Sequence, residues 1–265
     1  MICKDIIKIC DELAARRYAV DWDRKNDGLQ FGNDNWKVSK IYLAVDVDDE
    51  VLEDAITQGA DMIISHHPLI FGGINQINND TAIGRRLLQM AEHRISYFAM
   101  HTNFDVACMA DDAADHLGLL DRGVLEVTYT GEMGEEGIGR YGRLPQKMSV
   151  RDLCQLTKEK FCLDTVKVFG DLDREVERVA ISPGSGKGMS EVALIQGAEV
   201  LITGDIDHHT GIDAVADGLC IIDAGHYGLE HIFIDYMKDV LDEKIDPAEK
   251  VEIIKAPLRH PFTVL

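Results

Sequence analysis

Short apolar runs alternate with longer amphipathic stretches along most of this chain. The runs IYLAV at 41–45, DMII at 61–64 and ISYFAM at 95–100 have the length and the branched or aromatic side chains of buried strands. The stretches between them place apolar residues at a helical period, and an amphipathic helix over about residues 2–17 precedes them. Strands that alternate with helices in this way are typical of parallel β-α-β units, so we expect an α/β fold.

The second half of the chain resumes this alternation after a different middle. VLEVTYT at 124–130 and GIGRYGRLP at 137–145 predict two strands around the glycine-rich turn GEMGEEG, followed by a helix near 149–161. Five further strands are expected at 166–170, 177–182, 198–203, 219–224 and 251–256, with a long helix across 229–242. We place a domain boundary near residue 130, which gives an N-terminal domain over 1–130 and a C-terminal domain over 131–265.

Two segments of the chain resemble each other without gaps. Residues 40–65 lie over residues 178–203, and both segments contain Gln-Gly-Ala followed by an acidic residue, three apolar residues and Ser or Thr. Any two β-α-β units share periodicity, so coincidence is the alternative explanation. We favour a true duplication and expect two related α/β domains.

Composition and charge restrict the class of protein. The 265 residues are 46% hydrophobic and 28% charged, as in ordinary globular proteins, and no stretch resembles a signal peptide or a membrane span. A formal net charge of −20 disfavours nucleic acid as a partner, although a local basic pocket for a nucleotide remains compatible with it. The six cysteines contain no C-x-x-C motif, which predicts reduced thiols in a cytoplasmic protein.

Histidines and carboxylates follow three of the expected strands. The segments 95–105 and 219–230 each end an apolar run with a histidine and place a carboxylate four residues later, and DMIISHHP at 61–68 ends in two histidines. Residues four apart share one face of a helix, and open α/β sheets place their sites at the carboxyl ends of strands. A single histidine on an apolar segment is usually structural, but three such motifs converge here. The six expected metal ligands are His66, His67, His101, Asp105, His226 and Glu230. Nitrogen and oxygen donors in this number suit two divalent ions such as zinc, iron or manganese, so the sequence predicts a dinuclear metal site.

Three other segments carry candidate chemistry. GDIDHHT offers Asp205, His208 and His209 as groups that orient the ligands or line a substrate pocket, with plain surface residues as the alternative. SPGSGKG at 182–188 fails the spacing of a phosphate loop. It is compatible with a backbone nest for an anion, formed by Gly184, Gly186 and Lys187, or with a plain glycine turn.

Trp22 and the acidic run DVDDEVLED have more ordinary interpretations. Trp22 opens the polar segment WDRKNDGLQFG and is able to stack on a base, but packing within a loop is the favoured interpretation. The acidic run, which begins at Asp46, is expected to form the solvated face of a helix. Four further histidines have no other candidate metal ligand near them in the sequence and are expected to be structural, namely His93, His116, His231 and His260.

Taken together, WDRKNDGLQFG, GADMIISHHPLIF, AMHTNFD, PGSGKG, GAEVLITGDIDHH and DAGHYGLE resemble the family of GTP cyclohydrolase I type 2 homologues, also described as NGG-interacting-factor-like dinuclear metal proteins. The resemblance covers nearly the whole chain. It implies two related α/β domains with two metals between them, and subunits that assemble as a toroidal homohexamer. One departure lies in the first loop, where Arg24, Lys25 and Asn26 stand between the Trp-Asp pair and Asp27, whereas the family commonly has Asn soon after Trp-Asp.

The resemblance also assigns roles to the expected ligands. It implies that His66 and His226 serve one metal, that His67 and Asp105 serve the other, and that Glu230 bridges them. His101 is implied to be a ligand or a close neighbour.

The function expected from these features is metal-dependent hydrolysis of a small molecule. The family name implies GTP, with water attacking C8 of the guanine ring and the ring opening with loss of formate; Lys187 and the glycine segment would then hold the triphosphate. Asp205, His208 or His209 would move protons. Two alternatives remain: a metal-binding regulatory or scaffold protein without catalysis, and a metal-dependent phosphoesterase.

Overall fold

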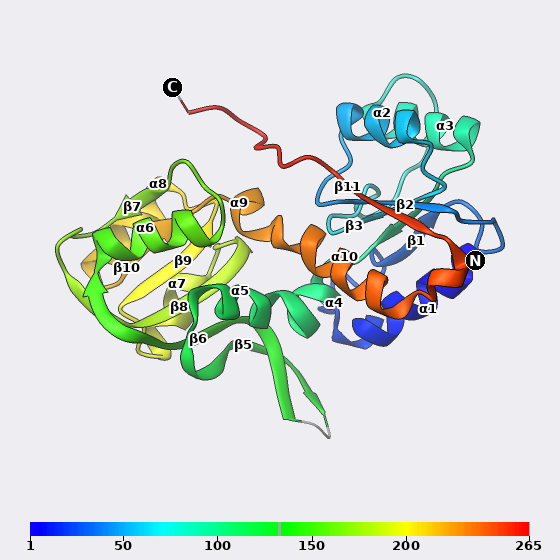
Figure 1. Ribbon diagram of the computed structural model, residues 1–265. Coiled ribbons are helices and arrows are strands. Elements are labelled where there is room, and N and C mark those ends of the chain that lie inside the picture. The colour runs from blue at the N-terminus through cyan, green and yellow to red at the C-terminus, as the bar shows by residue number, and fades with distance from the viewer. Residues whose placement is uncertain (132–133, 265) are drawn as a thin grey trace. The chain divides into compact units, whose positions relative to one another are not determined.

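Two sheets organise the chain in the computed structural model, which describes residues 1–131 and 134–264 (Figure 1). One compact unit, called unit 1, consists of Met1–Phe104 and Phe233–Leu258. The other, unit 2, consists of Asp105–Ile232 and Arg259–Leu265. The division into domains 1–130 and 131–265 stays a prediction. In the structure, the chain passes from one compact unit to the other after Phe104, after Ile232 and after Leu258.

Unit 1 contains a five-stranded sheet in the order β1-β4-β3-β2-β11. Its strands are β1 (Gly28–Phe31), β2 (Lys40–Ala44), β3 (Met62–Ser65), β4 (Ser96–Ala99) and β11 (Glu252–Lys255). Strands β4, β3, β2 and β11 are parallel to one another, and β1 pairs antiparallel with β4. Every residue of β3 and β4 is buried, which agrees with their continuous apolar runs, because a parallel sheet is covered on both faces.

Helices cover both faces of this sheet. In Figure 1, α2 (Asp49–Gln58) and α3 (Ala82–His93) lie on one side, while α1 (Cys3–Leu13) and α10 (Ile232–Lys244) lie on the other. Three short helices complete the unit, namely η1 (Arg16–Tyr18), α4 (Thr102–Phe104) and η3 (Pro247–Glu249). The side chains of Asp48 and Thr81 accept backbone N–H groups at the starts of α2 and α3, which satisfies donors that the helices themselves leave unpaired.

Unit 2 contains a six-stranded sheet in the order β5-β6-β8-β9-β10-β7. Its strands are β5 (Leu120–Gly131), β6 (Gly134–Ser149), β7 (Lys167–Phe169), β8 (Glu175–Ser185), β9 (Val200–Gly204) and β10 (Cys220–Asp223). Strands β8, β9 and β10 are parallel, and their neighbours pair antiparallel. Of the glycine-rich turn expected between β5 and β6, residues 132–133 lie outside the described residues.

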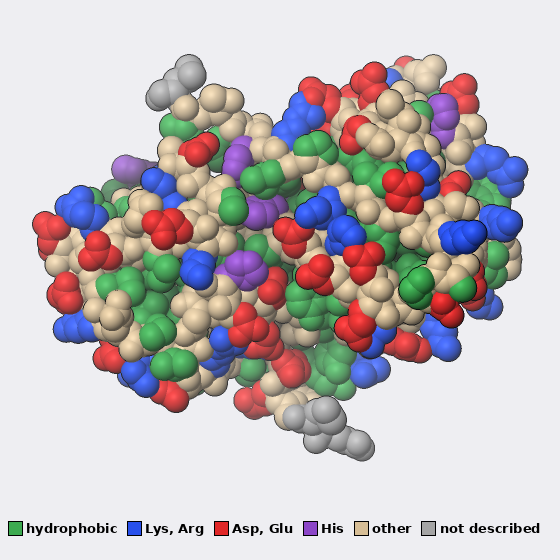
Figure 2. Space-filling view, viewed as in Figure 1, with side chains coloured by type: hydrophobic (Ala, Val, Ile, Leu, Met, Phe, Trp, Pro, Cys, Tyr) green, Lys and Arg blue, Asp and Glu red, His purple; other side chains and the backbone are tan. Residues whose placement is uncertain are grey.

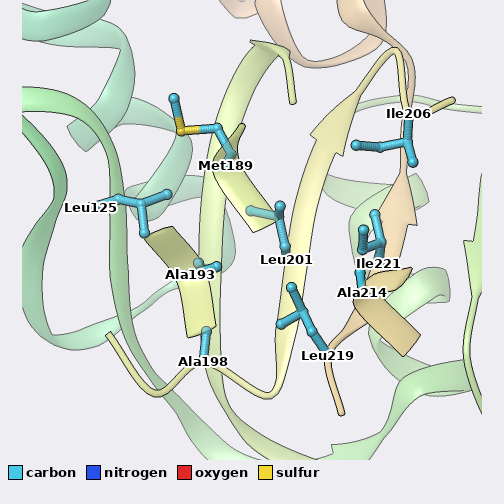
Figure 3. Packing of buried hydrophobic residues seen from close by; sticks show 10 residues of the cluster. Leu125, Met189, Ala193, Ala198, Leu201, Ile206, Ala214, Leu219 and Ile221 are labelled. Carbon is cyan, nitrogen blue, oxygen red and sulfur yellow. The ribbon is translucent and has the colours of Figure 1, made fainter. Parts of the chain in front are cut away.

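Helices pack against this second sheet to form its core. They are the π-helical turn η2 (Asp105–Met109), α5 (Ala110–Leu117), α6 (Val150–Lys160), α7 (Met189–Ile195), α8 (His208–Ala216) and α9 (His226–Glu230). Figure 3 shows how small and large side chains interlock, with Ala193 of α7 and Ala214 of α8 facing Leu201 and Ile221 of the central strands. Alanine at the helix positions lets each helix approach the sheet closely.

The two sheets share a topology. In each, three consecutive parallel strands alternate with helices, and the third strand pairs with an antiparallel strand that precedes the series: β1 beside β4 in unit 1, and β7 beside β10 in unit 2. Such a match is what a duplication requires, and the duplication itself stays a prediction. The mixed α/β class expected from the alternating pattern is confirmed.

Four details of the structure differ from the sequence expectations. The first helix ends at Leu13 rather than near residue 17, and the polar segment after Trp22 contains strand β1. β8 runs on to Ser185, so the first half of SPGSGKG belongs to a strand. The expected strand at 251–256 pairs with β2 and thus completes the first sheet rather than the second.

The surface reflects the acidic composition without separating the charges. On the face shown in Figure 2, carboxylates and basic side chains are intermingled and form no continuous basic stripe. In the described part of the chain, no helix combines the length and the apolar character that a membrane crossing requires.

Candidate metal centre

Three histidines of unit 1 converge at the carboxyl ends of neighbouring strands. His66 and His67 directly follow β3, and His101 follows β4 by one intervening residue. Parallel neighbours end at the same edge of a sheet, so these residues meet although 34 positions separate His67 from His101. One ring nitrogen of each lies within 4.8 Å of the others, which is close enough for joint coordination of an ion. His66 is fully buried, and His67 and His101 are half-buried.

Each of these histidines is held by its Nδ1 atom. The partners are the carbonyl oxygen of Met100 for His66 at 2.8 Å, Asp46 for His67 at 2.7 Å and Asp23 for His101 at 2.7 Å. An acceptor at Nδ1 fixes the ring and the tautomer and turns Nε2 toward a metal, as histidine ligands generally require. The three rings are therefore oriented for coordination by unit 1 alone.

Two aspartates from the loop before β1 support His101. Burial by itself would raise the pKa of Asp23, but hydrogen bonds from His101, Asn26 and Thr102 outweigh it and lower the pKa to about 2. Burial raises the pKa of Asp27 to about 6, although its Oδ1 accepts a hydrogen bond from the backbone N–H of His101 at 2.9 Å. The structure thus gives the polar loop after Trp22 a supporting role that the sequence did not predict.

Three further donors converge within unit 2. His226 begins α9 and Glu230 lies one turn later, so Nε2 of His226 is 3.2 Å from Oε2 of Glu230. Asp105 also presents an oxygen within 4.8 Å of a Glu230 oxygen. Glu230 is only 3% exposed, and its carboxylate oxygens lie within 4.8 Å of atoms of both Asp105 and His226 that could bind a metal ion.

Asp205 holds His226 in the same way that the aspartates of unit 1 hold their histidines. Its Oδ2 lies 2.7 Å from Nδ1 of His226. Asp205 has a positive φ of 57°, a conformation that a short polar residue tolerates better than most, and it directly follows β9. His208 and His209 are exposed in the first turn of α8, which Asp207 caps, and their rings contact each other.

Two glycines make room for this arrangement. A Cβ atom on Gly184 would collide with Oε1 of Glu230 and would lie 3.6 Å from Nε2 of His226. A Cβ atom on Gly204 would collide with the backbone nitrogen of His226. Gly184 of SPGSGKG and Gly204 of GDIDHHT therefore serve close packing around His226 and Glu230, whereas Lys187 is exposed.

We predict that Asp205→Ala weakens metal binding about 10- to 100-fold, because His226 loses the acceptor that orients its ring. Competition with a fluorescent chelator measures this change. Asp207→Ala is the matched control, since Asp207 is an exposed neighbour whose side chain accepts from the backbone at the start of α8. Equal affinities of the Asp205→Ala variant and the unaltered protein would contradict the orienting role.

The fold and these groups define a class: a mixed α/β protein with histidine and carboxylate clusters that could bind metal ions. Imidazole nitrogens and carboxylate oxygens without thiolates fit zinc, iron or manganese. The chain belongs to the Duf34/NIF3 (NGG1p interacting factor 3) family, whose model matches residues 1–261.

Similar proteins cover nearly the same length. A Clostridium acetobutylicum protein named "GTP cyclohydrolase 1 type 2 homolog" is 32% identical over 228 residues, covering 86% of this chain and 84% of its own. A Clostridium perfringens protein of the same name is 30% identical over 264 residues and 99% of both chains. The solved Bacillus cereus protein related to NIF3 has the same fold, with a TM-score of 0.89, 24% identity and coverage of 100% of this chain and 99% of its own.

Proposed function

We propose that this protein is a dinuclear-metal-dependent hydrolase that acts on a small nucleotide, with ring opening of GTP as the leading reaction. The observation that carries the proposal is that the Nδ1 atoms of four histidines, His66, His67, His101 and His226, are each bound to an oxygen that fixes the orientation of the ring. The names of the relatives support a nucleotide as the substrate.

The proposal brings the two ligand sets onto the same pair of ions. Unit 1 supplies three histidines and unit 2 supplies Asp105, His226 and Glu230, so neither set alone offers enough donors for two ions. Connectivity supports their union. Asp105 opens unit 2 only four residues after His101, a separation of at most about 14 Å along an extended chain.

The chain returns from unit 2 to unit 1 between Ile232 and Phe233, and here too a proposed ligand lies close in sequence to the boundary. Glu230 precedes Phe233 by three residues, and the ring of Phe233, which belongs to unit 1, lies 5.5 Å from that of His66. In this proposal His66 and His226 serve one ion, His67 and Asp105 serve the other, Glu230 bridges them, and His101 is a ligand or a close neighbour.

Divalent ions held by these residues would supply Lewis acidity and would lower the pKa of a bound water toward neutrality. The chain's own residues would orient the ligands and exclude bulk water. Asp23, Asp46 and Asp205 fix the imidazole rings, and the buried surroundings of His66 and Glu230 keep bulk water away from the electrophilic carbon. Asp205, His208 and His209 are the proposed proton carriers. The binding of a triphosphate by Gly184, Gly186 and Lys187 stays a prediction from the sequence.

Two other functions use the same groups. A regulatory or scaffold protein would close its coordination around the ions, whereas a catalytic site keeps one position for water. A phosphoesterase would direct the same water at phosphorus. We further propose that the protein works in the cytoplasm as a homohexamer, as the family resemblance implies.

One experiment tests the proposal and separates these alternatives. Protein purified without a histidine tag is stripped with a chelator, reloaded separately with zinc, manganese or iron, and analysed for metal content and for activity on GTP and on p-nitrophenyl phosphate. We expect about two ions per chain and release of formate from GTP. Release of phosphate from the ester alone would favour the phosphoesterase. Two bound ions without turnover would favour the scaffold, and no bound metal would exclude every version.

A further inference from the structure

Two large aromatic side chains of unit 1 are exposed beside the three-histidine set. Trp22 and Phe71 are each 60% exposed, and their ring centroids lie 6.1 Å apart. The ring of His101 lies 6.3 Å from Trp22 and 6.2 Å from Phe71. Packing within a loop, the interpretation favoured from the sequence, does not account for a tryptophan that is mostly in solvent. The planes of the Trp22 and Phe71 rings are tilted by 50°, so a planar ring that stacks on the face of Trp22 would meet the edge of Phe71.

A pocket of about 360 Å³ opens between the same two segments. Its walls include Arg16, Lys25, Asn26, Asp27, Ile70 and Gly72. The loop from 16 to 30 therefore carries both Trp22 and one wall of the pocket, and the loop from 70 to 73 carries both Phe71 and the other wall. A volume in the range of about 300–1,000 Å³ suits a small organic molecule.

The wall of this pocket bears unused polar groups. Neither Arg16 nor Lys25 forms an ion pair with a carboxylate of the described residues, although the guanidinium of Arg16 lies over Gly28 and donates to the carbonyl of Arg24. Asp27 is 4% exposed, and its Oδ2 has no hydrogen-bond partner within the described part of the chain. A ligand with both an anionic group and an N–H donor would satisfy these groups.

The basic residues are concentrated here against the trend of the whole protein. Arg16, Arg17, Arg24 and Lys25 fall within ten positions that also contain Asp21 and Asp23, in a chain that has 27 basic and 47 acidic residues. Arg17 packs over Tyr18 and Arg24 pairs with Asp21, which leaves Arg16 and Lys25 for the pocket. Two basic side chains that have no carboxylate partner in residues 1–131 and 134–264 give an anionic group a place to bind on a protein that is acidic as a whole.

We propose that Trp22 stacks on the base of a purine nucleotide, that Phe71 contacts the edge of the base, and that Arg16 and Lys25, rather than the segment of Lys187, bind its phosphate groups, with Asp27 accepting from a ring N–H. This inference deepens the proposed function, and it rests on that function only in treating His101 as a metal ligand. It assigns substrate recognition to unit 1.

Tryptophan fluorescence tests the stacking directly. In a Trp36→Phe background, Trp22 is the only tryptophan. The metal-free protein is titrated with GTP, GMP and inorganic triphosphate. We expect GTP and GMP to quench Trp22 emission, because a base stacks on the ring, and triphosphate alone to leave it unchanged. Arg16→Ala and Lys25→Ala should each weaken GTP binding about tenfold. Lys8→Ala, which removes a basic side chain that is 77% exposed on α1, should not.

A second pair of variants keeps the test independent of folding. Trp22→Ala should weaken GMP binding, measured by calorimetry, about tenfold, and Trp22→Phe should restore most of it because the aromatic face returns. Binding of GTP with unchanged Trp22 emission and with equal affinity in Trp22→Ala would overturn the inference.

The proposed function and this inference can fail separately. Quenching by nucleotides in a protein that releases no formate when loaded with metal would support the nucleotide site and overturn the hydrolase. Formate release by the metal-loaded protein with KM unchanged in Trp22→Ala and Arg16→Ala would support the hydrolase and overturn the nucleotide site.

Discussion

Replacing Glu230 with Ala is expected to lower bound metal from about two ions per chain to less than one, and to abolish hydrolysis. Glu230 is almost completely buried, and its carboxylate lies close to donor atoms of both Asp105 and His226. A carboxylate between two cations neutralises charge that both of them share, so its removal weakens both sites at once. His101→Ala should cost less metal, because an imidazole serves a single ion. Elemental analysis after gel filtration measures the difference.

Two controls make this result interpretable. Glu53→Ala removes an exposed carboxylate of α2 and should leave metal content unchanged. Glu230→Gln keeps the size of the side chain and removes its charge, so a loss of metal in this variant reports charge rather than a cavity. If Glu230→Ala and His101→Ala lost equal amounts of metal, the bridging role would be wrong, while the ligand roles would stand.

Periodicity and strand ends were sufficient to predict most of the fold and the convergence of the histidines. Buried parallel strands are continuous apolar runs, and β3 and β4 are of this kind, so their limits were within one residue of the prediction. Because parallel strands end together, the sequence also indicated that His66, His67 and His101 would meet. Strand β1 was missed because it is short and pairs at the sheet edge, where polar residues such as Gln30 are tolerated.

The groups that orient the histidines could not be predicted from sequence patterns. Asp46 was assigned to the solvated face of a helix, and Asp23 lay in a segment interpreted as a packed loop. Asp23 is 78 positions from His101 and comes beside it only through the packing of the β1 loop against the end of β4. An acceptor for Nδ1 has no fixed spacing from its histidine, since any oxygen at the right place will serve, as the carbonyl of Met100 does for His66.

The glycine segment after β8 shows how one composition supports different functions. Gly184 and Lys187 suggested an anion nest, while the geometry places Gly184 against Glu230 and leaves Lys187 exposed. Lys187→Ala separates the two roles. If a triphosphate binds at this segment, the variant should raise KM for GTP several-fold with metal content unchanged, because only anion binding is lost. Unchanged kinetics would remove Lys187 from the mechanism.

Gly184→Ala is expected to lower metal affinity at least tenfold while the protein remains folded. Gly184 has φ of +79° and Gly188 has φ of +84°, so an alanine at either position incurs a similar backbone strain of about 1–2 kcal/mol. Only at Gly184 would the added methyl group collide with Glu230; at Gly188 it would meet nothing within 4 Å. Gly188→Ala is therefore the matched control for strain, and thermal melting shows whether both variants lose similar stability. Chelator competition should then separate them, because Glu230 must move away from its buried position only in Gly184→Ala. Equal metal affinity in the two variants would mean that Glu230 tolerates displacement and does not need its present position to hold an ion.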